Sequence, residues 1–254
     1  MDSAVERAID VIQVRFGAQA LGRREVLPTV EAWPSGVHPL DRLTRAGGLP
    51  RGRVSLLGGR GSCGKTSLGL ALLAAATREF ASTAVIDAGH SFDPWSLEAF
   101  GPDFGALVLV RPPDAGSCGE AATALAKAGA GFLLLLLPHR VAAAADPWLP
   151  LLCSAAEKSG CVTVAVTEAA PRALAHASSF SVEVERTGWI REHGSLIGLR
   201  ARLTCVKLKL GLPGLAAEVE IRHPLGPGLA SEPVLAEVDG AWNQESREQA
   251  SAVG

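Results

Sequence analysis

Residues 59–67 read GRGSCGKTS, and this segment has the most specific chemical pattern in the sequence. It satisfies the phosphate-loop pattern G-x-x-x-x-G-K-[ST] at every fixed position. Glycines let the backbone approach a phosphate closely, and the N–H groups at the N-terminus of the next helix attract its negative charge. The segment therefore predicts a site for ATP. Its predicted cofactor-binding residues are Gly59, Arg60, Gly61, Ser62, Cys63, Gly64, Lys65, Thr66 and Ser67.

Within this loop, Lys65 is expected to reach the β- and γ-phosphates, and Thr66 to bind Mg²⁺ through its hydroxyl. A chance match is the alternative, because the chain holds 28 glycines. The surrounding sequence favours the functional interpretation. A β-like run over residues 53–58 leads into the loop and an Ala/Leu-rich helical run leaves it, which is the order that a phosphate loop requires.

The elements that must position this loop alternate between β-like and helical runs. Predicted strands cover residues 54–58, 82–87, 106–110, 132–137 and 161–167, and predicted helices cover residues 65–79, 95–99, 118–128 and 147–159. Nearly continuous apolar strands that alternate with helices indicate a parallel sheet covered on both faces. Beyond Phe180, strands at residues 182–185, 200–210 and 217–222 follow without helices. The predicted fold class is α/β, with a mainly parallel twisted sheet and antiparallel strands added at the C-terminal side.

Composition favours a globular protein with three parts. The chain has 254 residues, 48% of them hydrophobic, and a formal net charge of −2. Residues 1–22 are predicted to hold an amphipathic helix, residues 23–228 the nucleotide-binding core, and residues 229–254 an acidic, partly flexible tail. The longest apolar stretch, residues 128–137, is too short to cross a bilayer, so no membrane association is expected.

The five cysteines are scattered and contain no C-x-x-C pair. This pattern predicts a reducing cytoplasm, no cysteine metal site and mostly packed thiols. Cys63, inside the phosphate loop, is either reactive or simply a small residue that fills the loop.

Residues 47–54 (GGLPRGRV), the phosphate loop and residues 85–94 (VIDAGHSFDP) together resemble the core of the bacterial RecA recombinase family. The resemblance extends over residues 5–227 and implies an ATP-binding core of the RecA type. Two positions depart from the family. Gly89 stands where the family has a glutamate that positions the attacking water. In the family, the strand that corresponds to residues 132–137 ends in an aspartate associated with Mg²⁺, whereas here Leu137 stands at its end. The resemblance therefore implies that Thr66 and the phosphates bind the metal, with help from Asp87.

Other positions are interpreted through the same resemblance. Glu168 occupies the place of a switch glutamine and is either a catalytic residue or a solvent-facing strand end. Lys207 and Lys209 resemble two lysines that reach the nucleotide of a neighbouring subunit, and a solvated strand edge is the alternative. The chain contains no tyrosine to stack on adenine. Asp93 and Trp95 are the predicted nucleotide contacts in that region, although Trp95 also suits a core position.

The segment between Glu168 and Phe180 is too short for the long DNA-binding loop of the family. Because this segment is short, the chain most resembles the ImuA family. These are RecA-like accessory proteins of the bacterial mutasome, which acts in error-prone translesion synthesis. This resemblance implies as partners single-stranded DNA, a Y-family polymerase homologue and an error-prone replicative polymerase. RecA and a second copy of the chain are further expected partners. The predicted DNA-binding residues are Arg172, Arg186, Trp189, Arg191, Arg200 and Arg202.

The segment at residues 187–191 is expected to form a hairpin, with DNA binding or an ordinary solvated hairpin as the two interpretations.

Two classes of function are open. One is a weak, DNA-stimulated ATPase. The other is a nucleotide-binding adaptor that does not hydrolyse ATP and acts on RecA or the polymerases by docking.

Overall fold

The computed structural model describes residues 31–44, 46–209, 213–222 and 235–237, together with Val11, Val14 and Arg15. The chain divides into two compact units, residues 1–30 and 31–254. The apolar stripe predicted for residues 1–22 and most of the predicted tail lie outside the described residues. The larger unit is described below.

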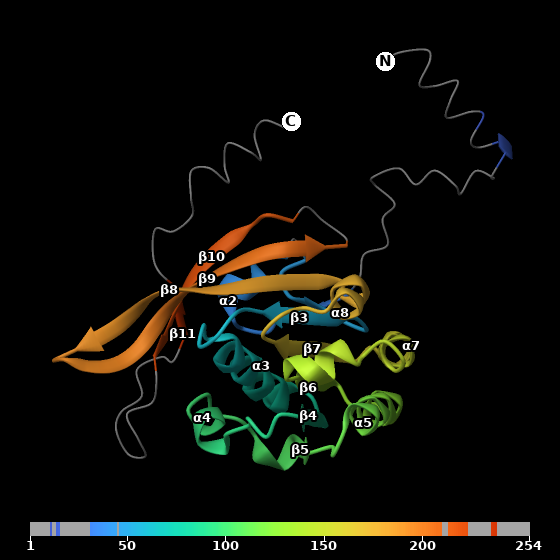
Figure 1. Ribbon diagram of the computed structural model, residues 1–254, viewed down its shortest axis with the longest axis horizontal. Helices are drawn as coiled ribbons and strands as arrows, with labels where there is room; N and C mark the ends of the chain where they lie inside the picture. Colours follow the sequence, from blue (N-terminus) through green and yellow to red (C-terminus); the bar gives the residue numbers. More distant parts are fainter. Residues whose placement is uncertain are drawn as a thin grey trace. The chain divides into compact units, whose positions relative to one another are not determined.

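Strands and helices alternate through the first part of the larger unit, as the sequence pattern predicts (Figure 1). The strands are β3 (Val54–Gly58), β4 (Thr83–Asp87), β5 (Leu107–Val110), β6 (Phe132–Leu136) and β7 (Val162–Thr167). The helices are α3 (Lys65–Glu79), α4 (Pro94–Glu98), α5 (Ala115–Lys127), α6 (His139–Ala143), α7 (Leu149–Ser159) and α8 (Arg172–Ala177), with a short 3-10 turn at Phe104–Ala106. Helices α6 and α8 were not predicted from the sequence, because they are only five and six residues long.

A small lead-in precedes this core. Strand β1 (Ala32–Trp33) pairs antiparallel with β2 (Leu49–Pro50), and α2 (His38–Asp41) lies between them in the chain. The Asp41 carboxylate accepts hydrogen bonds from the Ser35 backbone and hydroxyl and from the Gly36 N–H. Burial raises the pKa of Asp41, an effect that these bonds partly oppose.

The main sheet has nine strands in the order β11-β10-β9-β8-β3-β7-β6-β4-β5. Strands from β8 to β5 in this order run parallel, whereas β9 (Ser195–Leu208), β10 (Ala216–Arg222) and β11 (Leu235–Glu237) add antiparallel. The predicted fold class is thereby confirmed. Strand β11 falls inside residues 229–254, which the sequence analysis assigned to the tail.

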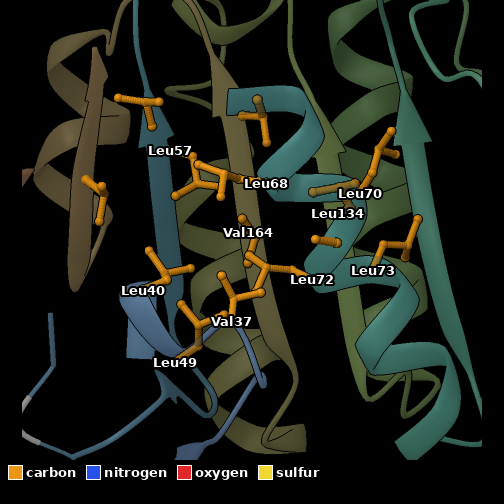
Figure 2. Close-up of a cluster of buried hydrophobic side chains, with 14 of the residues drawn as sticks. Val37, Leu40, Leu49, Leu57, Leu68, Leu70, Leu72, Leu73, Leu134 and Val164 are labelled. Carbon is orange, nitrogen blue, oxygen red and sulfur yellow. The ribbon is translucent and has the colours of Figure 1, made fainter. Parts of the chain in front are cut away.

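The sheet is covered on both faces, as the uninterrupted apolar strands predict. One buried cluster joins α3 and the lead-in to the sheet, and the second joins α5, α7 and α8 to the opposite face. Figure 2 shows the first cluster, in which Leu68 and Leu72 of α3 and Leu40 of α2 lie against Leu57 and Val164 of the strands. In the described residues, no helix is long and apolar enough to span a bilayer.

Strand β8 (Phe180–Glu192) is much longer than the strand predicted at residues 182–185. Residues 187–191, predicted as a hairpin, lie within β8, and the turn to β9 is made by His193 and Gly194, with φ of 48° and 85°. The prediction failed because Trp189 and Ile190 favour a strand. A two-residue turn needs positive φ at both central positions, and His193 and Gly194 meet that requirement. The end of this hairpin projects past the neighbouring strands (Figure 1).

Candidate functional site

The phosphate loop lies between β3 and α3, in the strand, loop, helix order that the motif requires. Gly61 and Gly64 have φ of 58° and 93°, which glycine adopts without strain. A Cβ on Gly59 would collide with the Val184 carbonyl oxygen of β8 and crowd the Cys63 sulfur. These glycines therefore allow the close approaches that shape the loop.

Lys65 begins α3, and its ammonium donates a hydrogen bond of 2.7 Å to the Gly61 carbonyl. Thr66 and Ser67 follow in the first turn of α3, where N–H groups have no carbonyl within the helix to bind. Lys65 and Thr66 both line an open pocket of about 260 Å³. The loop thus presents a cation, a hydroxyl and helix N–H groups to one cavity, a donor set that fits the phosphates and Mg²⁺ of a nucleotide.

The remaining loop residues support this arrangement from outside the pocket. Cys63 is buried, in agreement with a loop-filling role, whereas Arg60 and Ser62 are exposed. The Ser62 carbonyl accepts a hydrogen bond of 2.8 Å from the Arg186 guanidinium of β8. Because a carbonyl held in this way fixes the plane of its peptide, Arg186 braces the loop from the β8 side.

The wall opposite the phosphate loop is formed by residues that follow β4 and β6. Gly89 and Ser91 follow β4, and Leu137, Pro138 and His139 follow β6. A Cβ on Gly89 would lie 3.3 Å from Cγ of Pro138, so the two segments nearly touch. Among the described lining residues, the segments after β4 and β6 contribute no carboxylate, and the one acidic side chain of the lining is Glu168, which follows β7.

Glu168 directly follows β7 and reaches the phosphate loop. Its Oε1 accepts a hydrogen bond of 3.0 Å from the Gly61 N–H. Glu168 is exposed at the end of β7, so the interpretation as a solvent-facing strand end agrees with the structure, and the hydrogen bond adds a contact with the loop. A catalytic role for Glu168 stays a prediction.

Asp87, proposed to help with the metal, ends β4 with a side chain that is 0% exposed. Its carboxylate accepts hydrogen bonds from the Ser91 N–H and hydroxyl and from the Phe92 N–H, and its Oδ2 lies 3.4 Å from Nε of Arg111. Asp87 is not among the residues that line the pocket. In this structure the carboxylate holds the turn that carries Gly89, and its metal role stays a prediction.

Asp93 and Trp95 lie on α4, away from the pocket lining. Asp93 caps the helix, because its carboxylate accepts hydrogen bonds from the Trp95 N–H and from the Ser96 N–H and hydroxyl. The Ser96 hydroxyl is the main cause that lowers the pKa of Asp93. Trp95 is 69% exposed, so the core interpretation of this residue is wrong. Its stacking on a base remains a prediction.

Lys207 and Lys209 contact the C-terminal end of α8. The Lys207 ammonium donates to the Ala175 and His176 carbonyls at 2.6 and 2.8 Å, and that of Lys209 donates to Ala177 at 3.4 Å. Burial, followed by the charge of Lys209, lowers the pKa of Lys207. Both lysines thus satisfy carbonyls at a helix C-terminus, where cations are favoured. Their predicted action on a neighbouring subunit is not tested by this single chain.

Five of the six residues predicted to bind DNA lie on β8 and β9, and Arg172 lies on α8. Arg186 and Trp189 pair across the ladder with Ala201 and Leu199, which belong to the cluster on the α3 side. Arg200 and Arg202 alternate with these residues along β9 and therefore point to the other face. Both form ion pairs with carboxylates of β10, at 2.8 Å to Glu220 and 3.0 Å to Glu218. The six predicted residues do not form one basic surface.

Trp189 is 44% exposed, and the Arg186 guanidinium stacks over its ring at 4.1 Å from the centroid. Arg172 begins α8 and is exposed, and Arg191 donates to the Gly194 carbonyl at 3.4 Å within the hairpin turn. These arginines have no ion pair with the described carboxylates.

The sequence analysis did not assign a role to Ser91, His139 or Thr167, which the structure brings into the pocket. Each lies at or just beyond the C-terminal end of a parallel strand, where ligands bind in open α/β sheets. Their position at strand ends was the sequence signal that could have identified them.

Among the described residues, no group of three His, Cys, Asp or Glu side chains is arranged to hold a metal ion.

Comparison with known proteins agrees with this geometry. Residues 3–146 match the family model described as the RecA N-terminal domain. The chain is 28% identical over 285 residues to Protein RecA of Clostridium acetobutylicum, covering 94% of this chain and 81% of that protein. It is 29% identical over 266 residues to Protein RecA of Clostridium novyi, covering 90% and 75%. For Protein RecA of Brucella anthropi the identity is 26% over 283 residues, covering 94% and 78%.

Proposed function

Because the chain belongs to the RecA family, we propose that it is a nucleotide-binding accessory protein of DNA repair that binds ATP with Mg²⁺ and hydrolyses it slowly. One observation carries this proposal. Lys65 and Thr66 line a pocket. Among the described residues, the wall of this pocket at Gly89 and Leu137 has no carboxylate. Such a site supplies the groups that bind phosphates but no base at the two positions that the family uses for water and metal, and Glu168 at the phosphate loop is its remaining carboxylate among the described residues.

In the proposed site, the loop N–H groups and Lys65 hold the phosphates, and the Thr66 hydroxyl binds Mg²⁺. The metal, when bound, would neutralise charge on the phosphate oxygens. The residues of this chain then act mainly by binding and orienting the nucleotide. Among the lining residues that the structure describes, Glu168 is the one acidic side chain, and its carboxylate accepts a hydrogen bond from the Gly61 N–H.

A non-hydrolysing adaptor is the second candidate, and the same wall at Gly89 and Leu137 favours it. In this alternative the protein regulates RecA or polymerases by docking in its nucleotide-bound form. The two candidates differ in one measurable property, which is turnover.

We further propose a role in error-prone translesion synthesis, of the kind that the ImuA resemblance implies. It is supported by the short connection between β7 and β8, residues 168–179, half of which is α8. A segment of this length leaves no room for a long DNA-binding loop, so strand exchange is not proposed. The proposed partners are a Y-family polymerase homologue, an error-prone replicative polymerase, RecA and a second copy of the chain.

Single-stranded DNA is proposed to bind on the α3 side of the β8–β9 hairpin. Arg186 and Arg191 have no carboxylate partner among the described residues, and Trp189 exposes a ring on which a base could stack. Arg172 begins α8, which covers the opposite face of the sheet, so it is not part of this proposed surface. Arg200 and Arg202 contribute less, because their charges are neutralised by β10. Affinity should fall as the salt concentration rises.

The test compares ATP binding by calorimetry and ATP hydrolysis, with and without single-stranded DNA, in the wild type, Lys65→Ala and Lys158→Ala. Lys158 is an exposed lysine of α7 and serves as the matched control. Lys65→Ala should weaken ATP binding on the order of tenfold to a hundredfold, since a charge-assisted contact is lost. Turnover that depends on Lys65 and rises with DNA supports the slow ATPase. Binding without any such turnover supports the adaptor, and no binding by the wild type contradicts both.

A further inference from the structure

We infer that Glu168 is a specificity-determining residue that makes the phosphate-loop pocket favour a nucleoside diphosphate over a triphosphate. The inference rests on the proposed nucleotide site and concerns which phosphates that site accepts. It starts from the hydrogen bond between the Glu168 carboxylate and the phosphate loop.

Two side chains of opposite charge are bonded to the same residue of the loop. The Lys65 ammonium donates to the Gly61 carbonyl at 2.7 Å, and the Glu168 carboxylate accepts from the Gly61 N–H at 3.0 Å. In phosphate loops this lysine pairs with the β- and γ-phosphates. The carboxylate of Glu168 therefore lies at the end of the loop where the outer phosphates would bind.

At this position the carboxylate opposes a γ-phosphate in two ways. It occupies a backbone N–H of the loop, so a phosphate oxygen that approached Gly61 would compete with it. It also places a negative charge beside the added charge of the third phosphate, and like charges at short range repel each other. A diphosphate carries less charge and no third phosphate, so it avoids most of this cost.

Among the described residues, no lysine, arginine or histidine forms an ion pair with Glu168. Lys65 lines the same pocket and keeps its charge, but its ammonium donates to the Gly61 carbonyl rather than to the Glu168 carboxylate. Arg186 donates to the Ser62 carbonyl and stacks on Trp189. An amide at residue 168 would keep the shape and the acceptor oxygen but remove the charge.

The experiment measures dissociation constants by titration calorimetry for ADP and for a non-hydrolysable triphosphate analogue, both with Mg²⁺. It uses the full chain as wild type, Glu168→Gln, and Glu120→Gln, an exposed carboxylate of α5 as the matched control. The wild type should bind ADP at least as tightly as the triphosphate. Glu168→Gln should tighten triphosphate binding relative to ADP on the order of tenfold, because solvent and Mg²⁺ screen part of the repulsion. Glu120→Gln should leave the ratio unchanged.

The salt dependence of the ratio between the two dissociation constants is a second measurement. It would not change if Glu168 had only a structural role. Higher ionic strength should shift the wild-type ratio toward the triphosphate and leave the ratio of Glu168→Gln nearly constant.

Three results overturn the inference. If both proteins bind nucleotides with the same ratio, Glu168 does not discriminate, and the proposed nucleotide site stands. If Glu168→Gln weakens triphosphate binding, the carboxylate assists Mg²⁺ instead. If the folded wild type and Glu168→Gln bind neither nucleotide, the proposed function fails and the inference fails with it.

Discussion

The two walls of the pocket differ in which groups for nucleotide chemistry they contain. The phosphate-loop wall presents Lys65, Thr66 and the first turn of α3, and it is braced from behind by Arg186. The wall that follows β4 and β6 presents Gly89, Leu137 and uncharged neighbours such as Pro138. The first wall can bind phosphates, whereas the second supplies no carboxylate to activate water.

This difference indicates that binding and hydrolysis depend on separate parts of the fold. The loop wall is held by close backbone packing, which tolerates few substitutions. The opposite wall is made of residues just after strand ends, where a side chain can change without disturbing the core. The predictions below alter one wall at a time.

The largest effect is expected for Gly59→Val on the loop wall. The new side chain would collide with the Val184 backbone, so the free energy of unfolding should fall by about 2–3 kcal/mol and ATP binding should be lost. Urea denaturation and calorimetry measure the two effects. Gly188→Val is the control, because a Cβ there meets nothing within 4 Å, and it should change stability by less than about 0.5 kcal/mol. Equal behaviour of the two variants would contradict a tightly packed loop wall.

The next effect is expected for Gly89→Glu on the opposite wall. A glutamate here would point a carboxylate into the pocket, and ATP turnover should rise on the order of tenfold or more while the dissociation constant for ATP changes little. Pro138 must yield slightly to the new Cβ, which lies 3.3 Å from its ring. Gly89→Gln, with the same bulk and no base, is the control. If neither variant raises turnover, the missing carboxylate is not what limits hydrolysis.

A smaller effect is expected for Arg186→Ala, which removes the brace behind the loop wall. Without the hydrogen bond to the Ser62 carbonyl, ATP should bind about threefold to tenfold more weakly in calorimetry. Arg191→Ala is the control, since the contact of that guanidinium within the described part of the chain is with the Gly194 carbonyl of the hairpin turn. Equal weakening by both substitutions would assign the effect to general charge rather than to the brace.

The smallest effect is expected for Lys207→Met, which acts on the segment that follows Glu168. The α8 carbonyls of Ala175 and His176 would lose their cation, so the free energy of unfolding should fall by about 0.5–1 kcal/mol in urea denaturation. Lys209→Met should cost less, because its contact is longer and exposed. A larger loss for Lys209 than for Lys207 would contradict the larger contribution expected from the two Lys207 contacts.

Local patterns predicted the elements around the loop well. The bounds of β3 and α3 match the expectation, because an apolar run, a glycine loop and an Ala/Leu-rich run have strong local preferences. The short helices α6 and α8 were missed, since five or six residues give no clear period. The hairpin was misplaced at residues 187–191 because the prediction passed over the strand preference of Trp189 and Ile190, and the turn lies at His193 and Gly194.

Residue types at fixed local spacing were sufficient to predict the phosphate loop, the α/β class and the absence of carboxylates at Gly89 and Leu137. Which distant groups meet followed only from the folded arrangement of the strands. This arrangement joined Glu168 to Gly61, buried Asp87 against Arg111, and separated Arg186 from Arg200 onto opposite faces of the strands. Such contacts depend on strand order and register, and a register is set by the whole packed sheet rather than by any one segment.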